Sequence, residues 1–266
     1  MNHNAFLDKA LDLAKMAGER IMEIYQTDFD IGIKGDQSPV TEADIEAEAI
    51  ILKGLRTAYP NLPIVAEEEA AAGNVPEIAY YFVLVDPLDG TREFTSRNGA
   101  FTVNIALIHD RKPVAGVVHA PALNRTFGGV VANNAFELID GEAKPIHGRK
   151  ADYDNIVAVA SRSHRDEKTD VFLKKFNIKE TISIGSSLKF CLLAAGEADI
   201  YPRFGRTMEW DTAAGHAVLS AAGGCVTNED GTPFLYGKRN QPNDTDFANP
   251  SFIAHAHMTN KQRDYT

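Results

Sequence analysis

A long alternation of apolar and polar residues, broken only by short turn sequences, runs through residues 100–147. A period of two residues is typical of β-strands, and the first stretch reads as a half-buried strand. Its two sides carry Phe101, Val103, Ile105 and Leu107, against Thr102, Asn104 and Ala106. Turn-forming residues follow at 109–112, 123–125, 133–134 and 140–141. The sequence therefore predicts an antiparallel meander, which needs another layer to cover its apolar face.

The pattern changes after about residue 150. Short apolar runs predict strands over 156–160, 181–184, 198–201 and 225–227, the last of these being the final strand. Helical spacing predicts helices over 166–176, 187–195 and 211–222. Such alternation favours a sheet covered by helices. With 266 residues, one large domain or two small ones fit, and we predict two subdomains of one unit, 1–150 and 151–266.

Two helices and two short strands are predicted before the meander. Apolar residues at helical spacing define a helix over 4–25, with a stripe of Phe6, Ala10, Ala14, Ala17, Ile21 and Ile24. A second helix covers about 43–59, with Ile45, Ala49, Leu52 and Leu55 on one face. Thr41 and Asp44 resemble a capping box at its start, with Asp in place of the usual Glu. The strands are 63–66 and 80–85.

Charge and cysteine usage exclude several classes of protein. The chain has 27 Lys and Arg against 37 Asp and Glu, a net charge of −10, so it lacks the positive field that nucleic-acid binding needs. Cys191 and Cys225 are too few for a disulfide framework or a thiolate metal site, and we expect two reduced thiols. Residues 1–17 do not resemble a signal peptide, and no window approaches the roughly 18 apolar residues of a membrane span. We expect a cytoplasmic protein; peripheral attachment to the inner face of the membrane, and a monomer or a homodimer, stay open.

Acidic residues stand where α/β folds build their sites, at the carboxyl ends of strands and at the start of a helix. Glu67 and Glu68 follow one predicted strand, and Asp86 and Asp89 follow the next. Asp211 opens a predicted helix far downstream. Because α/β folds build their sites at such positions, the carboxylates are candidates for a single site.

The most informative stretch is the hexapeptide Asp86-Pro87-Leu88-Asp89-Gly90-Thr91. Its two carboxylates and the Leu88 carbonyl can face one point, and oxygen ligands of this kind suit Mg²⁺ together with water and a substrate phosphate. Gly90 permits a positive φ, and the amides that follow it can hold an anion. An Asp-Gly pair alone would be an ordinary turn, but the whole hexapeptide after a buried strand favours a metal site. A second stretch, Trp210 to Gly215, places Asp211 before small residues that allow close packing.

Three stretches of the chain resemble the signatures of the inositol monophosphatase superfamily of Mg²⁺-dependent, lithium-sensitive phosphatases. They are Glu67-Glu68, the hexapeptide from Asp86 to Thr91, and Trp210-Asp211-Thr212-Ala213-Ala214-Gly215. Further stretches resemble the CysQ branch, which removes the 3′-phosphate of adenosine 3′,5′-bisphosphate and its sulfated relative. They are Arg92-Glu93-Phe94, Arg97-Asn98-Gly99, Ser161-Arg162-Ser163-His164, Gly185-Ser186-Ser187-Leu188-Lys189-Phe190 and Tyr201-Pro202-Arg203-Phe204.

The resemblance implies a fold and a set of roles. The fold would be α/β, a layered α/β/α/β/α sandwich with an antiparallel N-terminal sheet and a smaller C-terminal α/β half. The ligands of two or three Mg²⁺ ions would be Glu67, Asp86, the Leu88 carbonyl, Asp89 and Asp211. The catalytic residues would be Asp44, Thr91 and Glu67. Substrate contacts would come from Gly90, Thr91, His164, Ser186, Lys189, Arg203 and Asp211.

The resemblance also implies an activity, the metal-assisted hydrolysis of a small nucleotide in sulfur assimilation. Two metals could hold both the attacking water and the leaving oxygen. Asp44 has two interpretations, a helix cap or, through a hydrogen bond from Thr91, a base. Lys189 and Arg203 are either ordinary solvated cations or the partners of a second phosphate. The rival functions are an inositol or sugar monophosphatase with the same metal site, and a non-catalytic nucleotide-binding or metal-binding regulator.

Overall fold

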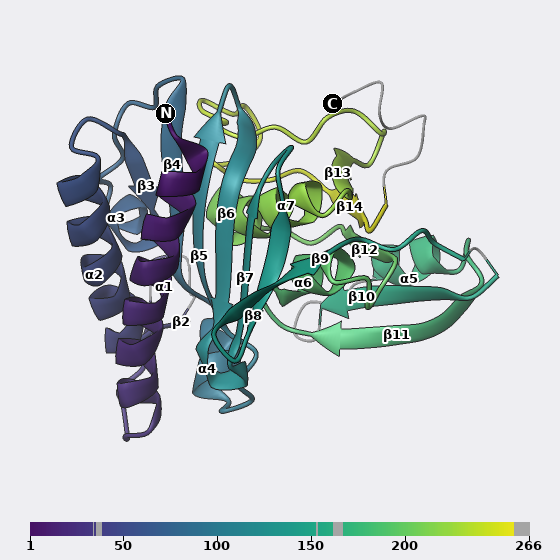
Figure 1. Cartoon of the computed structure of the whole chain (residues 1–266), viewed down its shortest axis with the longest axis horizontal. Helices are drawn as coiled ribbons and strands as arrows, with labels where there is room; N and C mark the ends of the chain where they lie inside the picture. The colour runs from purple at the N-terminus through teal and green to yellow at the C-terminus, as the bar shows by residue number, and fades with distance from the viewer. Residues whose placement is uncertain (34, 36–38, 153, 162–166, 258–266) are drawn as a thin grey trace.

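The computed structural model describes residues 1–33, 35, 39–152, 154–161 and 167–257. These residues form five layers (Figure 1): two helices, a seven-stranded sheet, two more helices, a five-stranded sheet and a last helix. The α/β/α/β/α sandwich implied by the resemblance is therefore confirmed. No helix within these ranges has the length and apolarity needed to cross a bilayer. Cys191 and Cys225 are buried and form no disulfide.

The first layer consists of α1 (His3–Tyr25) and α2 (Glu42–Ala58). The predicted apolar stripe of α1 is fully buried, which confirms it. The face predicted for α2 is wrong in part, because Ile45 is 58% exposed and Ala49 also faces solvent. The capping box at the start of α2 turns Asp44 inward. The buried face therefore carries acidic side chains that a search for apolar periodicity leaves out, and it consists of Ala43, Asp44, Ala47, Glu48, Ile51, Leu52 and Leu55.

The first sheet has the strand order β3-β4-β5-β6-β7-β8-β9. Its strands are β3 (Ile64–Ala66), β4 (Tyr81–Asp89), β5 (Thr102–His109), β6 (Lys112–Ala120), β7 (Arg125–Val130), β8 (Ala135–Ile139) and β9 (Glu142–Ile146). The predicted meander is confirmed, with its strands separated at the predicted turns. The sheet is not wholly antiparallel, because β3 pairs with β4 in parallel. That pair brings the ends of both strands, and the acids that follow β3, to one edge.

Strand β5 is buried on both faces, so the prediction of a half-buried strand is wrong. One face packs against α1 and α2, and the other against α7 (Glu209–Ala221). Small residues allow the close approach of α7: a Cβ on Gly116 would lie 2.7 Å from the Ala214 carbonyl oxygen. Thr102 and Asn104 are consequently buried polar residues, and the polar side of the strand faces protein instead of water.

The second sheet has the strand order β11-β10-β12-β14-β13. Its strands are β10 (Ile156–Ser161), β11 (Ile178–Ile184), β12 (Ile200–Arg203), β13 (Cys225–Asn228) and β14 (Phe252–His255). The prediction that the chain ends its strands near 225–227 is wrong, because β14 lies between β12 and β13 and pairs with both. A run of three apolar residues is too short for periodicity to reveal a strand; its pairing partners lie far away in sequence.

The helices α6 (Leu188–Ala194) and α7 lie between the two sheets, and α5 (Glu167–Leu173) covers the outer face of the second sheet. Shorter elements complete the fold: β1 (Gly32–Ile33), β2 (Pro39–Val40), α3 (Glu67–Ala71), α4 (Thr91–Thr95) and a 3₁₀ turn at Pro121–Leu123. The first sheet ends at β9 and the second begins at β10, on either side of residue 150. The division into subdomains 1–150 and 151–266 stays a prediction.

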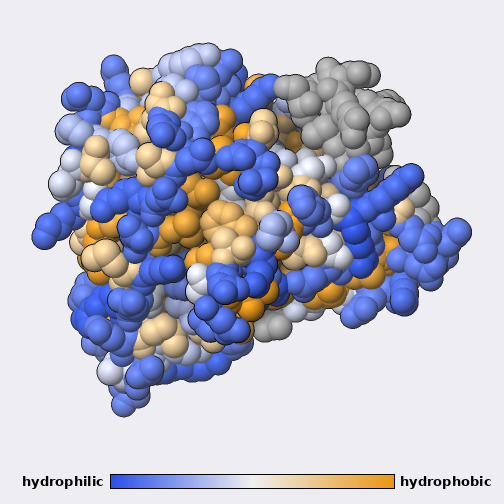
Figure 2. Space-filling model, viewed as in Figure 1, coloured by the Kyte–Doolittle hydropathy of each residue, from blue (hydrophilic) through white to orange (hydrophobic). Residues whose placement is uncertain are grey.

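The surface shown in Figure 2 is hydrophilic over most of its outline, while apolar residues gather across its middle, over the first sheet. The polar outline is the expected result of packing amphipathic layers, and the apolar residues in the middle of this view lie on the surface. The pocket described next lies deeper, where the two sheets and their helices meet.

Candidate active site

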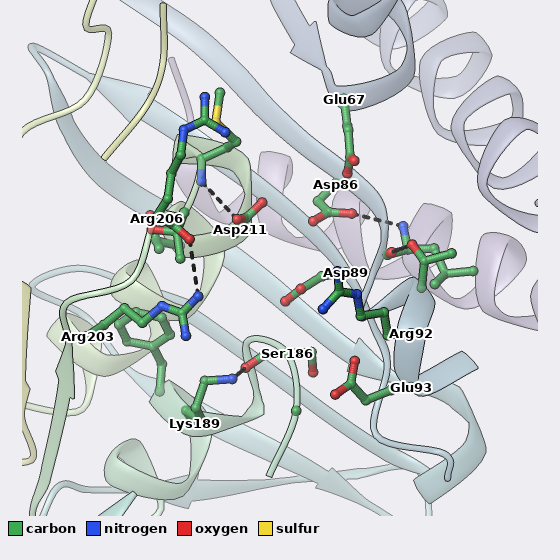
Figure 3. A pocket seen from close by; sticks show the side chains of 18 of the residues that line it. Glu67, Asp86, Asp89, Arg92, Glu93, Ser186, Lys189, Arg203, Arg206 and Asp211 are labelled. Carbon is green, nitrogen blue, oxygen red and sulfur yellow. Dashed lines mark hydrogen bonds between the residues drawn. The ribbon is translucent and has the colours of Figure 1, made fainter. Parts of the chain in front are cut away.

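A pocket of about 310 Å³ opens where the ends of β3 and β4 meet the starts of α3, α4 and α7. Its walls come from both sheets and from the segment that precedes α6. Figure 3 shows that Glu67, Asp86 and Asp89 lie on one side of it, with Asp211 facing them. Arg203, Arg206 and Lys189 lie on the other side. One side of the pocket therefore carries most of the acids, with Arg92 beside them, and is called the acidic wall; the other carries three cations, with Asp211 beside them, and is called the basic wall.

The end of β4 carries the first two acids. The strand continues past Val85 to Asp89, further than predicted, and its pairing with β5 shifts between Asp86 and Asp89. This irregularity is one extra residue on β4, and such bulges re-aim side chains. The Leu88 amide donates to Asp86 Oδ1 at 3.0 Å. Gly90 then adopts φ 94°, a left-handed conformation that suits glycine and lets α4 begin at once.

Glu67 is the first residue of α3 and lines the pocket. Glu69 instead points away and pairs with Arg56, with 2.6 Å between their side-chain atoms. The start of α3 is held by Glu48 of α2, whose two carboxylate oxygens accept the amides of Glu68 and Glu69 at 2.8 Å each. Of the three successive acids, Glu67 is therefore the one that the fold directs to the site.

Glu48 is a functional candidate that the sequence analysis missed. It is 4% exposed, and burial raises the pKa of its carboxyl to about 7, against which the two amides of α3 act. The sequence feature that could have revealed Glu48 is its position one helical turn after Asp44, which places both side chains on the same side of α2. Both acids face inward from one helix, Asp44 toward α4 and Glu48 toward α3.

Asp211 lies in the first turn of α7, and its Oδ2 accepts the amide of Met208 at 2.8 Å. A short chain of hydrogen bonds links it to Asp89. Ser187 donates to the Asp211 carbonyl at 2.6 Å, and Asn104 donates to Ser187 Oγ at 3.0 Å and to Asp89 Oδ2 at 3.4 Å. Asn104 and Ser187 were not predicted to belong to the site. Two sequence features could have revealed them. Asn104 is a polar residue inside an apolar strand, and Ser187 is the second Ser of the stretch that precedes α6.

The acids of the site are buried close to one another, and this burial raises the pKa values of three of them. Burial, and then the neighbouring carboxylates, raise the pKa of Asp86 and of Asp211 well above the ordinary range. Burial also raises the pKa of Asp89 to about 6, which the Lys189 ammonium partly opposes. A cluster of this kind is unfavourable when ionised and without cations. Its oxygens are therefore suited to hold hard divalent ions.

The geometry fits metal sites that share their coordination with water and substrate. Within the described residues, no three His, Cys, Asp or Glu side chains form a group that could hold a metal ion. Mg²⁺ commonly binds one or two carboxylates and completes its coordination with water and substrate phosphate. Glu67, Asp86, Asp89 and the Leu88 carbonyl on one side of the pocket, with Asp211 facing them, agree with that mode.

Asp44 lies behind this wall and is 1% exposed. Thr91, which lines the pocket, donates its hydroxyl to Asp44 Oδ1 at 3.2 Å and lies 3.4 Å from the Leu88 carbonyl oxygen. The predicted pair is therefore in contact. Through Thr91, the Asp44 carboxylate can reach the pocket although it does not line it.

The basic wall brings together three of the predicted nucleotide contacts. Lys189 is buried, donates to the Ser186 carbonyl and has a pKa lowered by burial to about 8. Arg203 is also buried and donates to the Arg206 carbonyl at 3.1 Å. Ser186 has φ 51°, and its buried hydroxyl has no hydrogen-bond partner in the described structure. The fourth predicted contact, His164, lies outside the described residues. Arg92, Glu93 and Arg206 line the pocket as well, without a predicted role.

Fold and site together define a phosphatase family: the chain belongs to the inositol monophosphatase family, which it matches over residues 3–260. It is 46% identical to the 3′(2′),5′-bisphosphate nucleotidase CysQ of Escherichia coli K12, over 92% of this chain and 98% of the relative. Its structure is similar to that of CysQ from Bacteroides thetaiotaomicron, with a TM-score of 0.78, 38% identity, and coverage of 96% and 98%. An inositol monophosphatase from Anabaena has a TM-score of 0.78, 25% identity, and coverage of 99% and 94%.

Proposed function

We propose that this protein is a Mg²⁺-dependent 3′(2′),5′-bisphosphate nucleotidase that releases the 3′-phosphate of adenosine 3′,5′-bisphosphate and of its sulfated form. The observation that carries the proposal is the two-walled pocket, in which buried acids face Lys189 and Arg203. A substrate with two anionic groups fits such a pocket, one group at each wall. The similarity to relatives named as nucleotidases, over nearly the whole chain, supports the same reading.

The proposed metal ligands are the acids and the carbonyl of the acidic wall, together with Asp211 facing them, and they would hold two or three Mg²⁺ ions. They are Glu67, Asp86, the Leu88 carbonyl, Asp89 and Asp211. When bound, Mg²⁺ lowers the pKa of a coordinated water and neutralises phosphate charge. Burial, and then mutual repulsion, raise the pKa of Asp86 and of Asp211, and bound cations would offset that repulsion. The net charge of −10 is thus compatible with a phosphate substrate, because the acids nearest the substrate are the ones that bind metal.

The remaining residues position water and substrate. Thr91 orients the attacking water, and Asp44 accepts its proton through the hydrogen bond from the Thr91 hydroxyl. Gly90 permits the close approach of the scissile phosphate to the start of α4. Lys189 and Arg203 bind the second phosphate, Arg203 by its planar fork and Lys189 as a point charge. Ser186 and His164 complete the nucleotide contacts in this proposal.

The test is the release of inorganic phosphate from adenosine 3′,5′-bisphosphate with Mg²⁺, measured with and without lithium. Inositol 1-phosphate and adenosine 3′-monophosphate serve as alternative substrates. Asp89→Asn is expected to lose activity, whereas Asp110→Asn, at an exposed turn, serves as the matched control. Preference for inositol 1-phosphate would favour a polyol phosphatase. Binding of the bisphosphate without release from any substrate would favour a non-catalytic regulator, and either result overturns the proposal.

A further inference from the structure

Asn104 is a buried polar residue that lies behind the proposed metal ligands. It belongs to β5 and is 1% exposed. On the same face of the strand, Ala106 and Ile108 pack into the apolar core that contains α7, so the Asn104 side chain points between the layers and not to solvent. A buried amide is costly unless it is hydrogen-bonded. The partners of Asn104 therefore indicate its function.

The side-chain nitrogen of Asn104 starts a chain of hydrogen bonds between two acids of the pocket. It donates to Asp89 Oδ2 at 3.4 Å and to Ser187 Oγ at 3.0 Å. Ser187, which is also 1% exposed, donates its hydroxyl to the Asp211 carbonyl oxygen at 2.6 Å. An ionised carboxylate and a carbonyl only accept. The amide nitrogen therefore has to face Asp89, and the hydroxyl hydrogen of Ser187 has to face Asp211.

This chain of bonds spans the pocket from one side to the other. Asp89 ends β4 of the first sheet, whereas Asp211 lies in the first turn of α7 and faces the other acids (Figure 3). The two carboxylates repel each other when both are ionised, so their own interaction cannot hold them at a fixed separation. The side chains of Asn104 and Ser187, one from each half of the sequence, supply a link behind them.

Thr102 shows that a polar residue on this face of β5 is not linked to the site by position alone. It is fully buried and lies directly opposite Asp89 in the pairing of β4 with β5. Its hydroxyl has no hydrogen-bond partner within the described residues, and the same is true of Asn104 Oδ1. Unsatisfied buried groups of this kind lower stability. What distinguishes Asn104 is its nitrogen, which bonds to both Asp89 and Ser187.

We propose that Asn104 and Ser187 are positioning residues that hold Asp89 and Asp211 at a set separation and so preorganise the site for Mg²⁺. Neither residue lines the pocket, and both act through the ligands that do. The inference rests on the metal site of the proposed function and adds two determinants of metal affinity to it. Loss of a group that orients a metal ligand typically weakens metal binding by about 10- to 100-fold.

The experiment measures Mg²⁺ binding by the metal-free protein and needs no turnover. Isothermal titration calorimetry gives the Kd for Mg²⁺, and thermal unfolding in EDTA and in Mg²⁺ gives the rise in Tm that the ion produces. Asn104→Leu and Ser187→Ala are each expected to raise this Kd by about 10- to 100-fold and to reduce the rise in Tm. Thr102→Val, which removes a buried hydroxyl beside the link, is the matched control and keeps both wild-type values.

A merely structural role has a different signature. It would lower the Tm by the same amount in EDTA and in Mg²⁺ and leave the Kd unchanged, because the loss would be common to the metal-free and metal-bound protein. The variant that carries both substitutions should lose no more Mg²⁺ affinity than the weaker-binding single variant, because Asn104 and Ser187 belong to one chain of bonds. Circular dichroism verifies that each variant folds, and if one single variant does not, the other gives the result.

The outcomes separate this inference from the proposed function. Unchanged Mg²⁺ affinity in both single variants overturns the positioning role and leaves the proposed nucleotidase intact. Additive losses in the double variant also overturn it, because the two residues then act independently. If the single variants bind Mg²⁺ weakly and the wild type binds it but hydrolyses no bisphosphate, the inference stands and the proposed function is overturned. A wild type that binds no Mg²⁺ overturns both.

Discussion

Thr91 and Asp44 are joined by a hydrogen bond in which the Thr91 hydroxyl donates to Asp44 Oδ1 at 3.2 Å. The other oxygen of the same carboxylate, Oδ2, accepts both the amide and the hydroxyl of Thr41 at 2.8 Å. The sequence presents a helix cap and a base as alternative roles for Asp44, yet a single carboxylate makes the contacts of both. The cap is confirmed by the structure, and the base role stays a prediction.

Replacement of Asp44 by Asn tests the base role. The amide keeps the size of the carboxylate but cannot accept a proton from Thr91 and the attacking water. We expect kcat to fall by about 100-fold or more, the range for the loss of general base catalysis. Phosphate release is measured at saturating Mg²⁺ and bisphosphate. Turnover close to that of the wild type would show that Asp44 is a structural residue only.

Thr41→Ala is the matched control for this variant. It removes the hydroxyl that bonds to Asp44 and caps the Ala43 amide at 3.2 Å, and leaves Thr91 in place. We expect a loss of about 1 kcal/mol in the free energy of unfolding, with kcat within a few-fold of the wild type. If Thr41→Ala lost as much turnover as Asp44→Asn, the defect of both would lie in the start of α2 and not in proton transfer.

Glu48 is expected to control the affinity for Mg²⁺ without touching the ion. Glu48→Ala leaves the amides of Glu68 and Glu69 without their acceptor, and these amides fix the start of α3, where Glu67 stands. Loss of a residue that orients a metal ligand typically weakens metal affinity by about 10- to 100-fold. Titration of activity with Mg²⁺ measures this effect, and Glu48→Gln should recover part of it because its amide oxygen can accept one of the two bonds. An unchanged Mg²⁺ dependence would contradict the positioning role.

The acids of the pocket could be predicted because each belongs to a short local pattern. Asp86 and Asp89 stand in one hexapeptide at the end of an apolar strand, and Asp211 stands at a helix start. Asn104 could not be predicted in the same way. It belongs to the site because it bonds to Ser187, 83 residues further on, and such contacts arise only when the two sheets have packed.

The fold shows the same limit of local patterns. The meander is regular enough for its strands and turns to be found from a period of two. The inner face of α2 was misplaced at Ile45 because buried acids replace apolar residues along it. Strand β14 was missed because its three apolar residues are recognised as a strand only from their pairing with β12 and β13. Tertiary contacts decided each of these cases.

Removal of metal is expected to make stability depend on pH. Burial raises the pKa of Asp89 from 3.8 to about 6 and also raises the pKa values of Asp86 and Asp211 well above the ordinary range. A carboxyl whose pKa is higher in the folded chain stabilises it fully below the unfolded pKa, and this contribution is lost as the pH rises through the folded pKa. In EDTA, the Tm should therefore fall as the pH rises from about 4 to 6, and it should continue to fall as the pH rises further. Mg²⁺ should restore it increasingly over the same range, because protons compete for the same oxygens.

Differential scanning calorimetry with EDTA or Mg²⁺, at a series of pH values, measures this dependence. Other carboxyls with lowered pKa values, such as those of Asp152 and Asp244, act in the opposite direction, so the wild type is compared with Asp86→Asn. The variant removes one buried charge and should show a smaller loss of Tm with rising pH in EDTA. Equal slopes for the two proteins would contradict the repulsion between the acids of the pocket.

Lys189 and Arg203 are expected to recognise the phosphate that is not hydrolysed. Lys189→Ala or Arg203→Ala should lower kcat/KM for adenosine 3′,5′-bisphosphate by about 10- to 100-fold, as for lost hydrogen bonds to a charged group. The same variants should lower kcat/KM for adenosine 3′-monophosphate far less.

Because burial lowers the pKa of Lys189 to about 8, wild-type kcat/KM for the bisphosphate should also fall more steeply above that pH than wild-type kcat/KM for the monophosphate. This difference should disappear in Lys189→Ala and persist in Lys174→Ala, an exposed control. Equal losses on the two substrates would mean that the basic wall serves the scissile phosphate, and that the pocket has no separate place for a second one.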